Sequence, residues 1–249
     1  MTIYIASNTA EWKATALSAL IAGIVFGKEY TAPPKSTRIE RALLEKYAGI
    51  YSLPSGARLV ASAGENCLRF EADGQAATEM LWSAGVGPAD RARSRELGER
   101  SQAMIARAAE GDYELLKEAF RGRIPADRIE AMEGEMWGEW KDRHGPFQSV
   151  RVLGVTLNEE GDAHALMRLQ FERGAVFLSY VWGPRRLLGI RPVASPSKSV
   201  FVPQSETEFA GFDLDRLQTV RLRFLLDAKG AVAGVERPDD STLTARRTE

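Results

Sequence analysis

Few residues of this 249-residue chain stand at a spacing that could support catalysis. Ser195 and Lys198 form a Ser-x-x-Lys pattern, and a lysine near a serine can take the hydroxyl proton and make the serine a nucleophile. Both residues lie in a proline- and serine-rich stretch, and neither Pro196 nor Ser197 indicates a buried helix. We therefore expect a polar linker here and keep a divergent serine nucleophile, Ser195 with Lys198, as an alternative.

The other residues with suitable chemistry have structural explanations. One predicted helix carries four closely spaced glutamates, Glu130, Glu133, Glu135 and Glu139. Because no Glu-x-x-His pattern accompanies them, a solvated helix face is favoured over a metal site. Cys67 lies on a short strand without a visible basic partner, so we expect a small core residue. His164, near Asp162 and a turn, falls on the polar face of its strand and should point outward. No catalytic residue, metal site or cofactor is predicted.

Composition excludes several classes of protein. The chain has 33 Lys and Arg against 34 Asp and Glu, a net charge of −1, so no basic field for nucleic acid is evident. Hydrophobic content of 44% and charged content of 27% are typical of globular proteins and exclude disorder. The single cysteine excludes an internal disulfide and a cysteine-rich zinc site.

The N-terminal segment contains the most apolar run of the chain. Residues 14–26 are apolar, but a run of this length is too short to span a bilayer, which needs about 20 residues. The preceding residues carry Glu11 and do not resemble a short basic export leader. We expect a strand at Thr2–Ala6 and a helix at Thr9–Phe26 that is apolar on nearly every side. Such a helix must dock on another surface or self-associate.

Short strands are predicted on both sides of a longer central region. A helix at Ile39–Tyr47 precedes three strand candidates, Arg58–Ala61, Cys67–Glu71 and Ala76–Trp82. Three strands leave open edges that later strands must pair or cover. Three later segments could do so, Ser199–Val202, Thr219–Leu226 and Ala231–Arg237. The polar tail from Pro238 is expected to fray.

The central region predicts an α+β unit. A first helix ends at Gly111, Asp112 caps a second, and a third follows Pro125 and ends at Gly145. Four antiparallel strands come next, at Phe147–Leu157, Ala163–Phe171, Val176–Trp182 and Leu187–Arg191. About 100 residues of this kind can form a self-contained unit inserted into the β domain.

Several segments resemble parts of a known family. The opening IYIASNTAEWKATALSALIAGIVFG looks like the last strand and C-terminal helix of serine β-lactamase/penicillin-binding-protein-like hydrolases. Residues 44–51 (LEKYAGIY) with Pro54-Ser55-Gly56 are similar to the start of the small, lipocalin-like β-barrel appended to many of them, and residues 209–234 to its closing strands. The central unit is similar to the cone-shaped fold of the nuclear-transport-factor-two-like superfamily. No Lys-Thr-Gly strand follows Lys198, so the catalytic motifs of the hydrolases are missing.

The resemblance to the cone-shaped fold implies an apolar pocket between the third helix and the curved sheet. Five aromatic residues could line it, Trp137, Trp140, Phe147, Tyr180 and Trp182. The favoured interpretation is that they fill the core, and the alternative is a site for a small apolar ligand.

The predicted organisation is α+β, with a small antiparallel barrel split by an inserted cone of three helices and four strands. The expected units are 1–35, a strand-helix remnant of a hydrolase domain; 36–90, the first half of the barrel; 91–193, the cone; 194–238, the second half; and 239–249, a polar tail. The leading hypothesis is a non-catalytic accessory module of a serine-hydrolase-like protein. It implies a hydrolase catalytic domain, or a second copy bound through Thr9–Phe26, as partner. The compartment is left open, although parent hydrolases are commonly exported.

Overall fold

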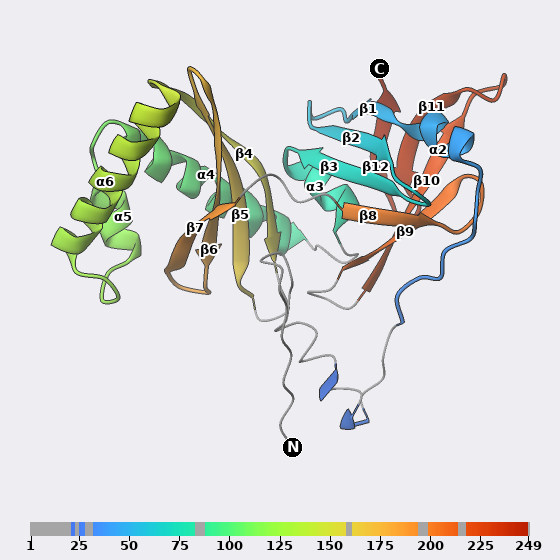
Figure 1. Cartoon of the computed structure of the whole chain (residues 1–249). Coiled ribbons are helices and arrows are strands. Elements are labelled where there is room, and N and C mark those ends of the chain that lie inside the picture. The colour runs from blue at the N-terminus through green and yellow to red at the C-terminus, as the bar shows by residue number, and fades with distance from the viewer. Residues whose placement is uncertain are drawn as a thin grey trace.

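The computed structural model describes residues 21–22, 25–27, 32–82, 88–157, 161–193, 199–213 and 218–248. The predicted strand Thr2–Ala6, most of the predicted helix Thr9–Phe26, and both Ser195 and Lys198 lie outside these residues. In the described part, Val25 and Phe26 are exposed. The protein is a mixed α+β structure, as expected, with a closed antiparallel barrel and a separate four-stranded sheet (Figure 1).

Eight antiparallel strands close the barrel in the order β1-β12-β11-β10-β9-β8-β3-β2. Their bounds are β1 Gly49–Ser52, β2 Arg58–Ala63, β3 Leu68–Asp73, β8 Ser199–Pro203, β9 Glu208–Asp213, β10 Gln218–Leu226, β11 Val232–Arg237 and β12 Asp240–Arg247. The first three strands join the last five through the pairs β3–β8 and β1–β12. Full closure leaves no unpaired strand edge in the barrel.

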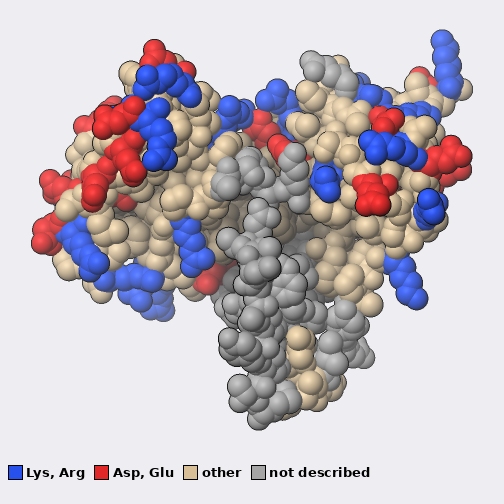
Figure 2. Space-filling view, viewed as in Figure 1, with Lys and Arg blue, Asp and Glu red and all other residues tan. Residues whose placement is uncertain are grey.

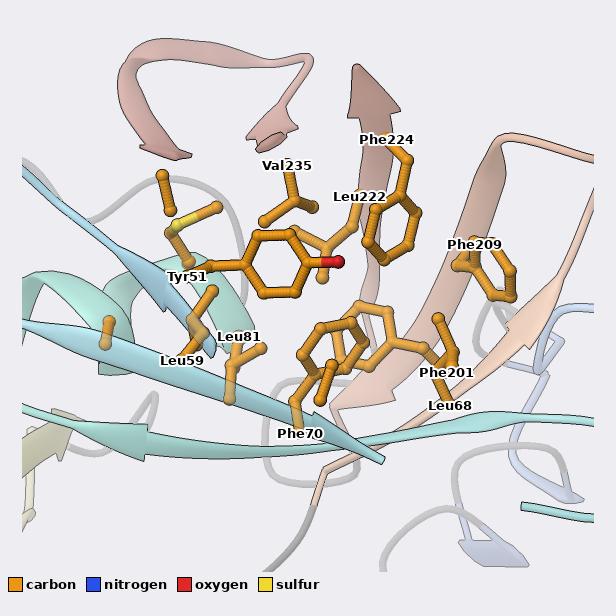
Figure 3. Close-up of a cluster of buried hydrophobic side chains, with 14 of the residues drawn as sticks. Tyr51, Leu59, Leu68, Phe70, Leu81, Phe201, Phe209, Leu222, Phe224 and Val235 are labelled. Carbon is orange, nitrogen blue, oxygen red and sulfur yellow. The ribbon is translucent and has the colours of Figure 1, made fainter. Parts of the chain in front are cut away.

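Aromatic side chains fill the barrel interior (Figure 3). Phe224 stacks on Tyr47 with ring centroids 4.1 Å apart and meets Phe209 edge-on at 5.4 Å. The hydroxyl of Tyr51 donates a 2.7 Å hydrogen bond to the carbonyl of Tyr47, at the end of helix α2 (Arg41–Tyr47). Burial raises the pKa of Tyr51 to about 12, so this phenol stays protonated and remains a donor. The barrel is a packed core.

Two predictions for the barrel are wrong. Residues 76–82 are not a strand, because helix α3 occupies Gln75–Leu81 and places Ala77, Met80 and Leu81 in the barrel core at helical spacing. The C-terminal tail does not fray, because β12 buries Leu243 and Ala245 and pairs with both β1 and β11.

The second unit, here the α/β unit, comprises three helices and one antiparallel sheet. The helices are α4 Pro88–Ala109, α5 Glu114–Ala119 and α6 Ala126–His144; the strands are β4 Phe147–Leu157, β5 Ala163–Phe171, β6 Gly174–Trp182 and β7 Leu187–Val193. The sheet order is β4-β5-β6-β7. Helices α5 and α6 lie on the side of the sheet away from the barrel (Figure 1). Asp112 was expected to cap the second helix, but the N-cap of α5 is Tyr113, without a side-chain cap, and Asp112 Oδ1, one residue before that N-cap, accepts a hydrogen bond from the backbone N–H of Glu114.

Helix α3 joins the two units. The apolar side of α3 packs into the barrel, and its polar residues contact β4. The Thr78 hydroxyl donates a hydrogen bond to the carbonyl of Leu153, and the side-chain amide of Gln75 forms hydrogen bonds with both the N–H and the C=O of Val155. Gly154 is required here, because a Cβ at that position would lie 1.8 Å from the Thr78 hydroxyl oxygen. The start of α4 adds a salt bridge from Arg91 to Asp240 of the barrel.

Candidate functional site

Three of the five predicted pocket aromatics surround Phe171. The ring centroids of Trp137 and Trp140 lie 6.2 and 6.5 Å from that of Phe171, and the centroid of Phe147 lies 5.7 Å from it. Trp137 also meets Trp140 edge-on at 5.4 Å. These rings come from α6, β4 and β5 and pack into one another, so much of this surface is protein core.

Tyr180 and Trp182 stand on the inner face of β6. Each is paired across the sheet with an alanine of β5, Tyr180 with Ala165 and Trp182 with Ala163. The indole N–H of Trp182 donates to the Ser101 hydroxyl on α4 at 2.9 Å. Through this hydrogen bond Trp182 connects α4 to the sheet. The alanines opposite the two aromatic residues are small, so the rings of Tyr180 and Trp182 face the helices.

Glu133 is not the solvated residue that was predicted. Its side chain is 8% exposed, although Glu130 and Glu139 on the same helix are mostly exposed. The reason is its position, one helical turn from both Ile129 and Trp137, in the centre of the buried stripe of α6. A carboxyl group therefore lies within an apolar layer.

The surroundings of Glu133 perturb its protonation. Burial raises the pKa of this carboxyl to about 7, and a hydrogen bond from the Trp137 side chain partly opposes the rise. Burial, and to a smaller extent the Glu133 carboxylate, raises the pKa of Tyr180 well above its ordinary value. Burial first, and then Glu133 and Glu130, raise the pKa of Tyr113, which packs against α6 with its hydroxyl 3.9 Å from the Cβ position at Gly134.

Tyr180 is the second unusual group of this cluster. It is 2% exposed, and the Glu133 carboxylate is close enough to add to the effect of burial on its pKa. We call Glu133, Tyr180, Tyr113 and Trp137 the Glu133 cluster. With a carboxyl that titrates near neutrality beside a phenol, the cluster can donate or accept a hydrogen bond or hold a proton.

The remaining candidates do not join this cluster. Cys67 is a free thiol, partly buried on the turn before β3. His164 is exposed, as its position on the strand predicts. Among the described residues no group of three or more His, Cys, Asp and Glu side chains could hold a metal ion.

Two surface hollows lie outside the Glu133 cluster. One, of about 750 Å³, surrounds the connection between α5 and α6 from Glu114 to Ala126. The other, of about 720 Å³, lies between the ends of α4 and α6 and the start of β4, where Phe147 forms part of its wall. On the face drawn in Figure 2, acidic and basic side chains are interspersed over the helices at left and neither sign forms a continuous field.

Comparisons of this chain with protein-family models, curated proteins and solved structures find no match. Within the part of the chain that the structure describes, no helix has both the length and the apolar character needed to cross a bilayer.

Proposed function

We propose that the α/β unit binds a small molecule at the Glu133 cluster and that the barrel serves as its scaffold. The observation that carries this proposal is the pair of buried polar side chains, Glu133 and Tyr180, on facing elements of an apolar core. Burying a polar group without a full set of hydrogen bonds costs about 1–3 kcal/mol. A ligand that bonds both groups would offset this cost, which explains why the two are kept together.

The chemistry of the cluster defines the ligand class. The aromatic and aliphatic side chains around Glu133 favour a molecule with a compact apolar body, such as a ring or a branched chain. The carboxyl of Glu133 and the hydroxyl of Tyr180 require one polar group that both donates and accepts hydrogen bonds, such as an alcohol, an amide or a protonated acid. The proposal keeps the alternative of a small apolar ligand in a cone-shaped unit and adds a polar end, formed by Glu133 and Tyr180, to its binding site.

The experiment is a titration of tryptophan fluorescence with cyclohexanol, benzamide and benzoic acid. Trp137 lies beside Glu133, so a bound molecule should quench its emission saturably. We expect Tyr180→Phe, which removes one oxygen atom, to weaken binding about tenfold, the effect of losing one hydrogen bond of about 1.4 kcal/mol. Glu135→Gln, an exposed position on the same helix, is the matched control and should bind as the original chain does. A linear, non-saturating response to all three compounds contradicts the proposal.

We also propose a role as a non-catalytic accessory module of a serine β-lactamase-like hydrolase. The packed barrel supports it, because an interior filled by Tyr51, Phe70, Phe201, Phe209 and Phe224 suits a scaffold and leaves ligand binding to other surfaces. The purified chain should then turn over neither a chromogenic ester nor a β-lactam. Turnover that disappears in Ser195→Ala would instead establish the alternative of a divergent hydrolase.

A further inference from the structure

The sheet of the α/β unit has a second face, opposite the Glu133 cluster, that places two arginines side by side. Arg151 on β4 and Arg168 on β5 are direct cross-strand partners. Like charges at such positions repel each other and destabilise a sheet. This pair is therefore locally unfavourable for the stability of the sheet, and unfavourable local arrangements are expected at functional sites.

Arg168 is held in place by a neutral group. Its Nη2 donates to the side-chain carbonyl of Gln170 at 3.1 Å, and the amide nitrogen of Gln170 is itself fixed by the carbonyls of Phe171 and Gly174 at 2.8 and 3.0 Å. Among the residues that the structure describes, the buried Nε of Arg168 has no hydrogen-bond partner. The guanidinium is therefore oriented by Gln170, and none of the described carboxylates is recorded in an ion pair with it.

The carboxylate that pairs with Arg151 is shared with a second arginine. Asp73, at the end of β3, forms salt bridges of 2.9 Å with both Arg58 and Arg151. One negative charge thus pairs with the positive charges of both Arg58 and Arg151. Phe177, the partner of Arg168 on β6, adds a partly buried aromatic ring at the other side.

The geometry points to an anion site formed by Arg168 and Arg151 on this face, next to the barrel, for a small molecule that carries a phosphate or carboxylate group. A planar guanidinium donates two parallel hydrogen bonds to such an oxyanion, and the free Nε of Arg168 is one of the donors of that fork. Ser149, an exposed residue opposite Gln170 across the sheet, could add a hydroxyl. This site is on the other face of the sheet from Glu133 and does not depend on the proposed function.

The test compares the thermal unfolding of the whole chain in phosphate, acetate and chloride at equal ionic strength. We expect phosphate, and more weakly acetate, to raise the unfolding temperature saturably above its value in chloride. In Arg168→Gln the dissociation constant for phosphate should rise at least tenfold. In chloride the same variant should unfold at the same or a higher temperature than the original chain, since the like-charge pair is gone.

Two further variants make the result decisive. Arg221→Gln removes an exposed arginine of β10 for which the described residues show no ion pair, and should leave the phosphate effect unchanged. Arg168→Lys keeps the charge but loses the fork, so it should fold normally and bind phosphate more weakly than the original chain. Equal unfolding temperatures in all three anions, or a phosphate effect that survives in both Arg168 variants, would overturn the anion site.

Discussion

The replacement Glu133→Gln separates the charge of the buried carboxyl from its shape. Burial raises the pKa of Glu133 from 4.5 to about 7. Between these two pH values the folded chain holds a proton here that the unfolded chain has lost, so the free energy of unfolding decreases as the pH rises. At roughly 1.4 kcal/mol for each pH unit, the loss between pH 4.5 and pH 7 is about 3 kcal/mol. Glutamine has almost the same shape and no charge to lose.

The assay is urea unfolding followed by tryptophan fluorescence at intervals from pH 4.5 to pH 8. Trp137, Trp140 and Trp182 all lie in the α/β unit, so the signal reports mainly on that unit. We expect similar stabilities for the original chain and the variant near pH 4.5. At pH 8 the variant should be more stable by about 3 kcal/mol, because it carries no buried charge.

Both chains retain all the other ionisable residues, and the difference between the two profiles removes their contribution. The control Glu135→Gln changes the same group at an exposed position and should shift the stability by less than about 0.5 kcal/mol at every pH. Parallel profiles for the original chain and Glu133→Gln would refute the reasoning, since they would mean that Glu133 ionises as it does in water.

Three destabilising substitutions and one control, Gly189→Ala, test the fold. Gly154→Ala should destabilise the chain by about 3 kcal/mol or more in thermal unfolding, because its Cβ would meet Thr78, whereas Gly189→Ala, with nothing within 4 Å, should have little effect. Arg237→Met removes a buried guanidinium that bonds the carbonyls of Glu79 and Trp82, and should cost about 2–4 kcal/mol in urea unfolding. Phe224→Ala leaves a cavity in the barrel core and should cost about 3–5 kcal/mol, read from circular dichroism. A cost below about 1 kcal/mol for any of these three would contradict the contact assigned to it.

Strong periodicity made most of the α/β unit predictable. The helical spacing of Ile129, Met132, Met136 and Trp140 predicts one helix, and α6 forms there, but it buries Ile129 and Trp140 while Met132 is exposed. The alternation along Ala163–Phe171 corresponds to β5 with the same bounds. Strand β4 also has the predicted bounds, Phe147–Leu157, because turn residues punctuate the sequence on both sides.

The errors have physical causes that the sequence carries only weakly. The segment 75–81 is short and apolar, a pattern that strands and buried helices share. It forms a helix because one side of that helix packs in the barrel core and the other contacts β4. In β12 the alternation of buried and exposed side chains is limited to Leu243 and Ala245, a weak strand signal. The strand is stable because it forms hydrogen bonds with β1 on one side and β11 on the other. Strand β1, Gly49–Ser52, is four residues long and gains its stability from the same closure.

The candidate site could have been predicted in part. Tyr180 and Trp137 were identified as residues facing the interior. The absence of a Glu-x-x-His pattern favours a solvated face for Glu133, although its spacing from Ile129 and Trp137 places it on the apolar stripe. The pair Arg151 and Arg168 depends on the strand register, which hydrophobic patterning alone does not give.

The central claim, that Glu133 is a buried carboxyl that contacts a ligand, is tested most directly by carbon-13 NMR of the glutamate side-chain carboxyls. The Glu133 resonance, assigned from its loss in Glu133→Gln, should titrate with a pKa of about 7 and shift when a compound that quenches Trp137 is added. A Glu133 carboxyl that titrates near 4.5 and does not respond to any such compound would contradict the account.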